Sequence, residues 1–402
     1  MKHTAALAQC GAWLLGLACT AATGTTPATQ QCLAQLRPAA LAAKVQPAWF
    51  DRLTQGLTLQ APLVQRLDEQ PEFTTPIWDY LAVLVDAQRV DDGVQRLATY
   101  ASTLAKVQQR FGVDPATVVA VWGIESDYGR RVGTRPVVES LLTLSCMGRR
   151  QGYFRTELFA AMRVLQTEAF APERMTGSWA GAFGQTQFMP STYERLAVDG
   201  DGDGKANLVE SAPDALASTA HFLKDAGWQP GQPWGIEVSV PAGRTLRDGR
   251  RWRRPLQAWA QDGVQPVTGA SWREVAPQLS AQTPAALLRP AGDQGPAWLV
   301  FANFHALYRY NAAESYALAL GLLSDALQNR PPLRATWPTD DLGLSRAQRR
   351  ELQTLLTLRG HDIGAIDGAL GKRSRQAIRA EQQRLGLPVT GRAGQRLLRA
   401  LR

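Results

Sequence analysis

Glu125 is the residue of this sequence whose setting points most clearly to acid chemistry. It follows an apolar run, Val118 to Ile124, in the stretch DPATVVAVWGIESDYG that begins at Asp114 and ends at Gly129. Aspartate followed by proline predicts a helix start, because aspartate caps the first free amides and proline is tolerated at the first helical position. The run is apolar on almost every side, so we expect a buried helix that Gly129 stops. A carboxyl group there is costly unless it is paired or does chemistry, although a surface carboxylate at a frayed helix end is the simpler interpretation.

A second group of chemically active residues matches the pattern of a calcium-binding loop. Its sequence, DGDGDGKANLVE, runs from Asp199 to Glu210, between segments with helical patterns at 191–197 and 215–226. Three carboxylates this close repel one another unless a cation or disorder relieves them; an exposed Asp/Gly turn can match so short a pattern by accident, but the flanking helical segments favour the metal. We expect a structural Ca²⁺ ion, since no step of acid catalysis needs it. By position, the candidate ligands are Asp199, Asp201, Asp203, the carbonyl of Lys205, Asn207 and Glu210.

A third stretch, SWAGAFGQTQFMPSTY from Ser178 to Tyr193, connects these two groups to a known family. The motifs GIESDYG and SWAGAFGQTQFMPS together resemble the lytic murein transglycosylase B family, whose core is similar to goose-type lysozyme. The resemblance covers most of residues 30 to 330. It continues, in the same order, through QPEF (70–73), WDYL (78–81), GRRQGYFRTEL (148–158) and RYN (309–311).

The resemblance implies cleavage of the MurNAc-GlcNAc β-1,4 bond of peptidoglycan with formation of 1,6-anhydromuramic acid. Glu125 would act first as acid and then as base, while the acetamido group of the sugar stabilises the cation. For Glu125 to hold a proton at the start its pKa must be raised, and Trp122 and Ile124 offer an apolar setting. Asp127 would point to another face of a helix, so one acid fits this scheme better than hydrolysis by two carboxylates. The chemistry needs no cofactor.

The same resemblance assigns further residues to the substrate and the ion. In the family the acid that closes the metal loop can lie beyond the twelfth position, so Asp214 competes with Glu210. Glycines at 177, 181 and 184 either let a ligand approach the backbone or serve packing. The arginines named below either meet anionic peptide stems or are solvated surface residues. The implied substrate-binding residues are Ser178, Gln187, Phe188, Met189, Arg149, Arg150, Asn303 and Tyr310.

Two other functions remain compatible with the sequence. A hydrolytic muramidase would use the same fold and the same Glu125 but admit water. A non-catalytic peptidoglycan-binding or scaffold protein is disfavoured by the presence of Glu125, Ser178 and Gln187 together. For any of these functions the partners are peptidoglycan glycan strands, with cell-wall synthesis proteins as further candidates. We expect a monomer that does not bind nucleic acid.

The N-terminal residues 1–22 have the features of a secretory signal peptide. Lys2 and His3 precede an uncharged stretch whose apolar part, Gly11 to Ala18, is too short for a membrane anchor. Cleavage near Ala22 would release a periplasmic protein. A loose lipoprotein-type site at Cys19 offers outer-membrane lipidation as the alternative. A mature chain keeps Cys32 and Cys146, which in an oxidising compartment suggests one disulfide, with two buried thiols as the alternative.

The domain organisation follows from length, charge and periodicity. The chain has 402 residues, 45% of them hydrophobic, which is enough for at least one large core. Residues 343–402 hold 13 Lys/Arg and 4 Asp/Glu, so the whole net charge of +9 belongs to this segment. The basic pI is therefore weak support for nucleic-acid binding. We expect a mainly α (α+β) protein with a catalytic domain over 30–331, a linker over 332–342 and a peptidoglycan-binding domain over 343–402.

Periodicity indicates the elements within these domains. Residues 92–111 have the spacing of one helix, and alternation from Ile236 to Val240 predicts a strand in a partly β subdomain over 235–296. Helical pattern returns at 298–327. Ser345 with Gln348 forms a capping box at the start of a C-terminal three-helix domain, for which a generic helical or DNA-binding bundle is the alternative.

Overall fold

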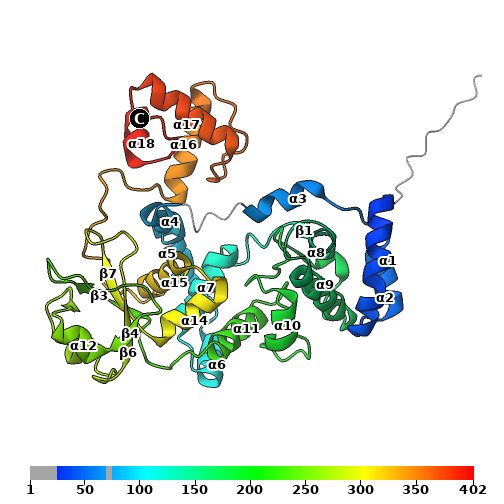
Figure 1. Cartoon of the computed structure of the whole chain (residues 1–402), viewed down its shortest axis with the longest axis horizontal. Coiled ribbons are helices and arrows are strands. Elements are labelled where there is room, and N and C mark those ends of the chain that lie inside the picture. Colours follow the sequence, from blue (N-terminus) through cyan, green and yellow to red (C-terminus); the bar gives the residue numbers. More distant parts are fainter. Residues whose placement is uncertain (1–24, 69–74) are drawn as a thin grey trace, which may run out of the picture.

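The computed structural model describes residues 25–68 and 75–402. The protein is mainly helical with small antiparallel sheets, as the sequence predicts. Figure 1 shows a broad helical lobe, a sheet at one end of it, and a separate group of three helices beside α4 (Ile77–Leu84). The expected signal at 1–22, Cys19 and the QPEF motif at 70–73 lie outside the described residues. In the described part of the chain no helix combines the length and apolar character that crossing a bilayer requires.

The central element is α7 (Pro115–Ser126), and it forms as the sequence predicts. The side chain of Asp114 caps it, accepting from Ala116 N at 2.8 Å and Thr117 N at 3.4 Å. Nine of its twelve residues are buried. It packs against four helices, α5 (Ala87–Thr99), α6 (Ala101–Phe111), α11 (Ala212–Asp225) and α15 (Glu314–Leu327).

The helix that carries Glu125 ends earlier than predicted. Gly129 does not stop it, because Asp127 already leaves the helix with φ 54° and Tyr128 follows with φ 60°. The predicted helix over 92–111 is also two helices, which meet at Tyr100. The ring of Tyr100 stands edge-on to Trp122 of α7 at 5.4 Å between centroids, so the break lies where the chain packs on the central helix.

A second helical group lies beside α7. It contains α8 (Val137–Cys146), α9 (Gln151–Gln166) and α10 (Pro190–Leu196), and its core is separate from the core around α7. The N-terminal helices α1 (Pro27–Ala42), α2 (Pro47–Thr54) and α3 (Ala61–Gln65) cover it. A disulfide between Cys32 and Cys146 joins α1 to the end of α8. This bridge fixes the N-terminal segment to the core, and two free thiols are not what the structure contains.

The β subdomain is a five-stranded antiparallel sheet in the order β4-β6-β7-β3-β5. The predicted strand near Ile236 is β3, but residues 298–300, expected to be helical, belong to strand β7. Trp298 pairs with Glu237 across the sheet, so the subdomain extends past 296. The strands are β3 (Gly235–Ser239), β4 (Arg253–Pro255), β5 (Gln265–Pro266), β6 (Pro284–Leu288) and β7 (Ala297–Val300), with α12 (Leu256–Gln261) and α13 (Trp272–Val275) in the connections. The helices α14 (Ala302–Asn311) and α15 follow.

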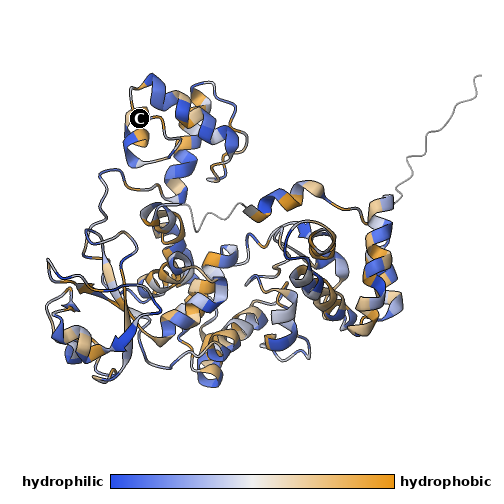
Figure 2. Cartoon of the chain, viewed as in Figure 1, coloured by the Kyte–Doolittle hydropathy of each residue, from blue (hydrophilic) through white to orange (hydrophobic). Residues whose placement is uncertain are grey.

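The C-terminal segment forms three helices around its own small core. They are α16 (Arg346–Leu358), α17 (Lys372–Arg384) and α18 (Gln395–Leu401). The predicted capping box of Ser345 and Gln348 is present at the start of α16. Figure 2 shows that α17 is mainly hydrophilic, whereas α8 and α15 inside the larger lobe carry long hydrophobic stretches.

Buried ion pairs fasten this C-terminal group to the larger lobe. Arg346 donates to both oxygens of Asp86, at 2.7 and 2.9 Å, and to Asp127 at 2.5 Å. Arg392 donates to both oxygens of Asp79 at 2.7 Å. Gly343 allows the close approach, because a Cβ there would lie 2.7 Å from the Cα of Asp79. The two parts of the chain are therefore held in one arrangement by charged groups that water reaches poorly.

Arg346→Ala should destabilise the folded chain more than loss of a surface charge would. Asp86 is 6% exposed, and the substitution removes its cation, whereas Asp127 loses one of its three arginines. Removing one partner of a buried pair costs about 3 kcal/mol, so calorimetry should show a first transition several degrees lower. Arg375→Ala, on the exposed face of α17, is the matched control. Equal transition temperatures for Arg346→Ala and Arg375→Ala would contradict a stabilising role for the buried ion pairs of Arg346.

Acid should weaken the same interface. Burial alone would raise the pKa of Asp86, but the hydrogen bonds and charge of Arg346 hold that pKa below its usual value. A lowered pKa contributes stability above the ordinary aspartate range, and this stability is lost as the pH falls through the lowered value. The difference in stability between the wild type and Arg346→Ala should therefore shrink in acid.

Candidate active site

Glu125 lies in a cavity of about 690 Å³ at the end of α7. The hydroxyl of Tyr316, on α15, donates a hydrogen bond to Glu125 Oε1. Tyr316 is 2% exposed, and burial followed by the charge of Glu125 raises its pKa well above the ordinary value. The phenol therefore stays protonated and remains a donor. Among the described residues that line the cavity, Glu125 is the one carboxylate.

Two hydrogen bonds bring the separate sequence motifs together around this carboxylate. Ser126, the residue after Glu125, donates to the carbonyl of Gln185 at 2.5 Å. Tyr310 of α14 donates to the carbonyl of Thr186 at 2.7 Å and stacks on Tyr316 with centroids 6.4 Å apart. The loop from Ser178 to Met189 is thus fixed both to the end of α7 and to the far wall formed by α14 and α15.

This loop is itself tightly folded. The hydroxyl oxygen of Ser178 accepts from the backbone of Ala180 and Ala182, at 3.3 and 3.1 Å. Gly181 has φ 92°, and a Cβ there would lie 2.4 Å from Leu141. Gly184 has φ 75°, and a Cβ there would lie 2.8 Å from the carbonyl of Leu208. These glycines are required by the turn and by close packing within the protein.

Most of the residues implied by the family resemblance meet at this cavity. Gln187 uses its amide nitrogen to donate to Val132 O at 2.9 Å and Gly184 O at 2.8 Å, while its amide oxygen has no hydrogen-bond partner in the described chain. Arg150 is exposed and lies over the ring of Tyr153 at 4.6 Å. The predicted residues on the wall are Glu125, Arg149, Arg150, Ser178, Gln187, Met189 and Tyr310.

Two of the predicted substrate-binding residues lie elsewhere. Phe188 is 2% exposed, and its ring packs on Phe222 and Tyr310, so it supports the wall from behind. Asn303 is fully buried, and the backbone of another loop satisfies the hydrogen-bonding groups of its side-chain amide. It accepts from Gln229 N at 2.7 Å and donates to the carbonyls of Gln229 and Gln232. An amide satisfied in this way has no group left for a sugar.

The structure adds residues that the sequence did not reveal: Tyr316, which contacts Glu125 without lining the cavity, and four residues of the wall. Tyr316 is a single tyrosine in an apolar helix, and by pattern it is indistinguishable from a core aromatic. Tyr153 and Trp179 lie inside the matched motifs, and this position in a motif is the one feature of the sequence that could have placed them at the cavity. Arg309 and Asn311 flank Tyr310 in the RYN motif and also line the cavity.

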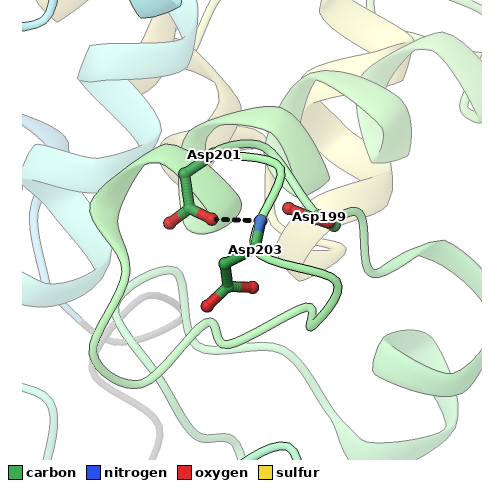
Figure 3. A group of neighbouring side chains, drawn as sticks. All are labelled: Asp199, Asp201 and Asp203. Atoms are coloured by element: carbon green, nitrogen blue, oxygen red, sulfur yellow. Dashed lines mark hydrogen bonds between the residues drawn. The ribbon is translucent and has the colours of Figure 1, made fainter.

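The predicted metal loop brings three carboxylates together. Asp199, Asp201 and Asp203 each place one oxygen within 4.8 Å of the others. Figure 3 shows them around the loop, with Asp201 accepting from the backbone of Asp203 at 3.2 Å. Asp199 also accepts from the amides of Gly202 and Gly204, at 2.6 and 2.8 Å. Oxygen donors on so short a loop suit a hard cation such as Ca²⁺.

The two candidates for the closing acid stand outside this cluster. Glu210 is held by Arg174 at 2.8 Å and by Asn207 at 3.2 Å. Asp214 is fully buried and accepts from the amides of Gly200 and Asn207, at 2.8 and 2.6 Å. Asp214 thus braces the loop through its backbone, whereas Glu210 is exposed and paired with an arginine.

Comparisons with known proteins agree with this architecture. A family model described as transglycosylase SLT domain matches residues 28–325, and one described as a peptidoglycan binding domain matches residues 345–401. Membrane-bound lytic murein transglycosylase B of Escherichia coli (strain K12) is 32% identical over 250 residues, which make up 62% of this chain and 66% of that protein. The alignment therefore spans just under two thirds of the curated relative.

Solved structures show the same similarity. The crystal structure of SltB3 from Pseudomonas aeruginosa in complex with NAG-anhNAM-pentapeptide is 44% identical, with a TM-score of 0.74. It covers 94% of this chain and 100% of its own. The Escherichia coli lytic transglycosylase SLT35 in complex with calcium is 28% identical, with a TM-score of 0.62, covering 75% of this chain and 93% of its own.

The fold and the acid-bearing cavity define a lysozyme-like enzyme that cleaves a glycan. More specifically, the chain belongs to the family of lytic murein transglycosylases that carry the transglycosylase SLT domain and act on peptidoglycan. This membership agrees with the resemblance found in the sequence motifs.

Proposed function

We propose that this protein cleaves the MurNAc-GlcNAc β-1,4 bond with Glu125 as its one acid and base. The observation that supports this most directly is the cavity wall, where Glu125 is the one carboxylate among the described residues. Asp127, the nearest other acid in sequence, is committed to arginines instead. It lies 2.5 Å from Arg346 and 3.2 Å from Arg130. Among the described residues of the wall, a mechanism with two carboxylates has no second group.

The chemistry then proceeds in two proton transfers through the same residue. Protonated Glu125 gives its proton to the glycosidic oxygen, and the C1–O bond breaks as the acetamido group of the muramic acid stabilises the cation. The resulting carboxylate takes the proton of the 6-hydroxyl, whose oxygen closes on C1. The products are a free 4-hydroxyl and a 1,6-anhydro sugar, and no water is consumed. The muramidase alternative needs water to arrive in place of the 6-hydroxyl.

The wall residues have roles that follow from their contacts. Tyr316 fixes one oxygen of Glu125 and stabilises its ionised form in the second step. Ser178, whose oxygen already accepts two amides, still has its hydroxyl hydrogen to donate, and the amide oxygen of Gln187 accepts. We assign Met189 and Tyr310 to the apolar surface of the sugar, and Arg149 and Arg150 to carboxylates of the stem peptide.

The remaining parts of the chain support action on an insoluble wall. We propose residues 30–331 as the catalytic domain, with the sheet inside it, 332–342 as linker and 343–402 as a domain that binds peptidoglycan. The relative SltB3 was crystallised with NAG-NAM-pentapeptide, a fragment of this polymer. A signal at residues 1–22 would deliver the protein to the periplasm, either free or lipidated at Cys19. Peptidoglycan strands are its partners, and the chain acts as a monomer.

We also propose that the loop of Asp199, Asp201 and Asp203 binds a structural Ca²⁺. Two of the three aspartates are exposed and Asp199 is half-buried; the cluster is built from oxygen donors and lies between α10 and α11. The carbonyl of Lys205 is the next ligand by position. Asp214 is already occupied by backbone amides, so Glu210 closes the site after leaving Arg174.

Glu125→Gln should abolish formation of 1,6-anhydromuropeptides from purified peptidoglycan. General acid catalysis contributes about 10²–10⁴-fold in rate, and here the one residue serves both steps. Mass spectrometry identifies the products, which are lighter than hydrolysis products by one water. Glu168→Gln, an exposed carboxylate elsewhere, should cleave normally. Reducing-end muramic acid from the wild type would favour the muramidase, and an active Glu125→Gln would exclude Glu125 as the acid.

Tyr316→Phe should slow cleavage and move the alkaline fall of the pH–rate profile to higher pH. In the wild type, the hydrogen bond from Tyr316 stabilises the ionised carboxylate of Glu125. Without this bond the pKa of Glu125 rises, so Glu125 keeps its proton to a higher pH. A hydrogen bond to a charged group is worth about 1.5–3 kcal/mol, or roughly one to two pH units. Tyr193→Phe, which loses a buried phenol that does not contact Glu125, should leave the profile in place. A profile that is unchanged in Tyr316→Phe would contradict the positioning role.

Calcium should raise the melting temperature of the wild type and EDTA should lower it. A ligand that binds the native state alone stabilises it by about 2.7 kcal/mol at one hundred times its Kd. Asp201→Ala with Asp203→Ala should remove the difference while leaving some activity at low temperature. Asp51→Ala with Asp293→Ala, two exposed aspartates far from the loop in sequence, should retain it. If EDTA has no effect on the wild type, the loop is a turn without an ion.

A further inference from the structure

A second cavity, of about 930 Å³, adjoins the cavity of Glu125 at the turn between α14 and α15. We call it the Trp252 cavity. Ala312, in that turn, lines both cavities, and α14 contributes Tyr308 to the new one and Tyr310 to the catalytic one. The remaining walls of the Trp252 cavity come from the start of α4 and from the β subdomain. A chain that leaves the cavity of Glu125 over Ala312 therefore enters this second space.

Aromatic side chains line the Trp252 cavity. The guanidinium of Arg247 lies over one face of the Trp252 ring at 2.8 Å from its centroid, and 46% of Trp252 remains exposed. It stands on a fixed turn, because Gly249 N donates to Leu287 O at 2.8 Å and Trp252 N donates to Gly249 O at 2.9 Å. Tyr308 and Trp78 line the same cavity, and the indole N–H of Trp78 is buried without a partner in the described chain. The rings of Trp252 and Tyr308 offer flat apolar surface, as a sugar-binding cavity requires.

The charges of the cavity are arranged to leave one arginine available. Arg250 lies over the Tyr308 ring at 3.5 Å and pairs with Glu314 at 3.7 Å, so its charge is largely compensated. Arg251 is exposed and makes no salt bridge in the described part of the chain. A guanidinium group in this position can pair with a carboxylate in two-point geometry.

We propose that the Trp252 cavity binds the next disaccharide-peptide unit of the glycan strand that is being cleaved at Glu125. Trp252 and Tyr308 contact a sugar ring, and Arg251 pairs with a carboxylate of the stem peptide on that unit. The inference rests on the proposed function and extends it, because it makes the enzyme sensitive to the length and peptide content of its strand. The sugar ring and the peptide carboxylate both belong to peptidoglycan. Because Ala312 lines both cavities, one strand can extend from the Glu125 cavity into the Trp252 cavity.

The test measures binding in the Glu125→Gln background, so that no strand is cleaved. Three ligands are compared: long strands with stem peptides, the same strands after enzymatic removal of the stems, and the shortest oligomer that fills the catalytic cavity. Adding Arg251→Ala should weaken binding of the long stem-bearing strands about tenfold and leave the other two ligands unaffected. Arg273→Ala, an exposed arginine in the same β subdomain outside the cavity, should change none of the three.

Substitutions of Trp252 test the proposed sugar contact independently of Arg251. Trp252→Ala should weaken long strands with or without stems, since stacking on the ring does not need the peptide, and Trp252→Phe should restore most of the binding. Circular dichroism and melting of each variant identify a folding defect. Equal affinities of long strands for all variants, or an equal loss on the shortest oligomer, would overturn the proposal. Cleavage by Glu125→Gln would overturn the proposed function instead, without affecting the comparison of affinities.

Discussion

A carboxylate at the end of a buried helix is the constraint on which this structure depends. Nine of the twelve residues of α7 are inaccessible, so the protein must surround the helix completely and still leave Glu125 open to a ligand. Tyr316 gives the carboxylate of Glu125 a hydrogen-bond partner in this buried setting. Because burial raises the pKa of Tyr316, its phenol stays neutral and protonated while it donates. The helices that cover α7 supply this phenol, and the loop after Ser178 supplies the opposite wall. Packing and chemistry therefore use the same contacts.

The end of α7 shows how two acids two residues apart acquire different roles. Glu125 faces a cavity without another carboxylate in its described wall, whereas Asp127 turns into a network with Arg89, Arg130 and Arg346. Burial opposes ionisation of Asp127, but hydrogen bonds from Arg130 and the charge of Arg346 hold its pKa below the usual value. One of these arginines comes from the C-terminal helices, so the domain that follows the catalytic lobe also completes the support of the catalytic helix. The basic charge of that domain is thus partly structural.

The sequence predicted what local rules decide and missed what tertiary contacts decide. The capping of α7 by Asp114, the strand at Ile236 and the capping box at Ser345 depend on neighbouring residues, and all three formed. The family motifs also located most of the cavity wall. The motifs assigned Asn303 and Phe188 to the substrate, because a motif match does not show which way a side chain points, and neither residue lines the cavity. Tyr316 and Arg346 could not be identified, since their partners lie 191 and 219 residues away in sequence.

Backbone conformation identifies the same region independently of these side chains. Eight described residues other than glycine have positive φ, and five of them line the Glu125 cavity or directly follow Glu125 and Ser126 in the chain: Asp127, Tyr128, Arg150, Gln187 and Ala312. Each such residue costs of order 1–3 kcal/mol unless its surroundings impose the conformation. Here the surroundings do so through Arg346 at Asp127, the backbone of Arg89 at Tyr128 and two carbonyls at Gln187. The strained turns adjoin both Glu125 and Gln187, which line one cavity. The stability of the buried core therefore maintains a geometry that the local backbone does not favour, and that geometry keeps Glu125 on the wall of the cavity.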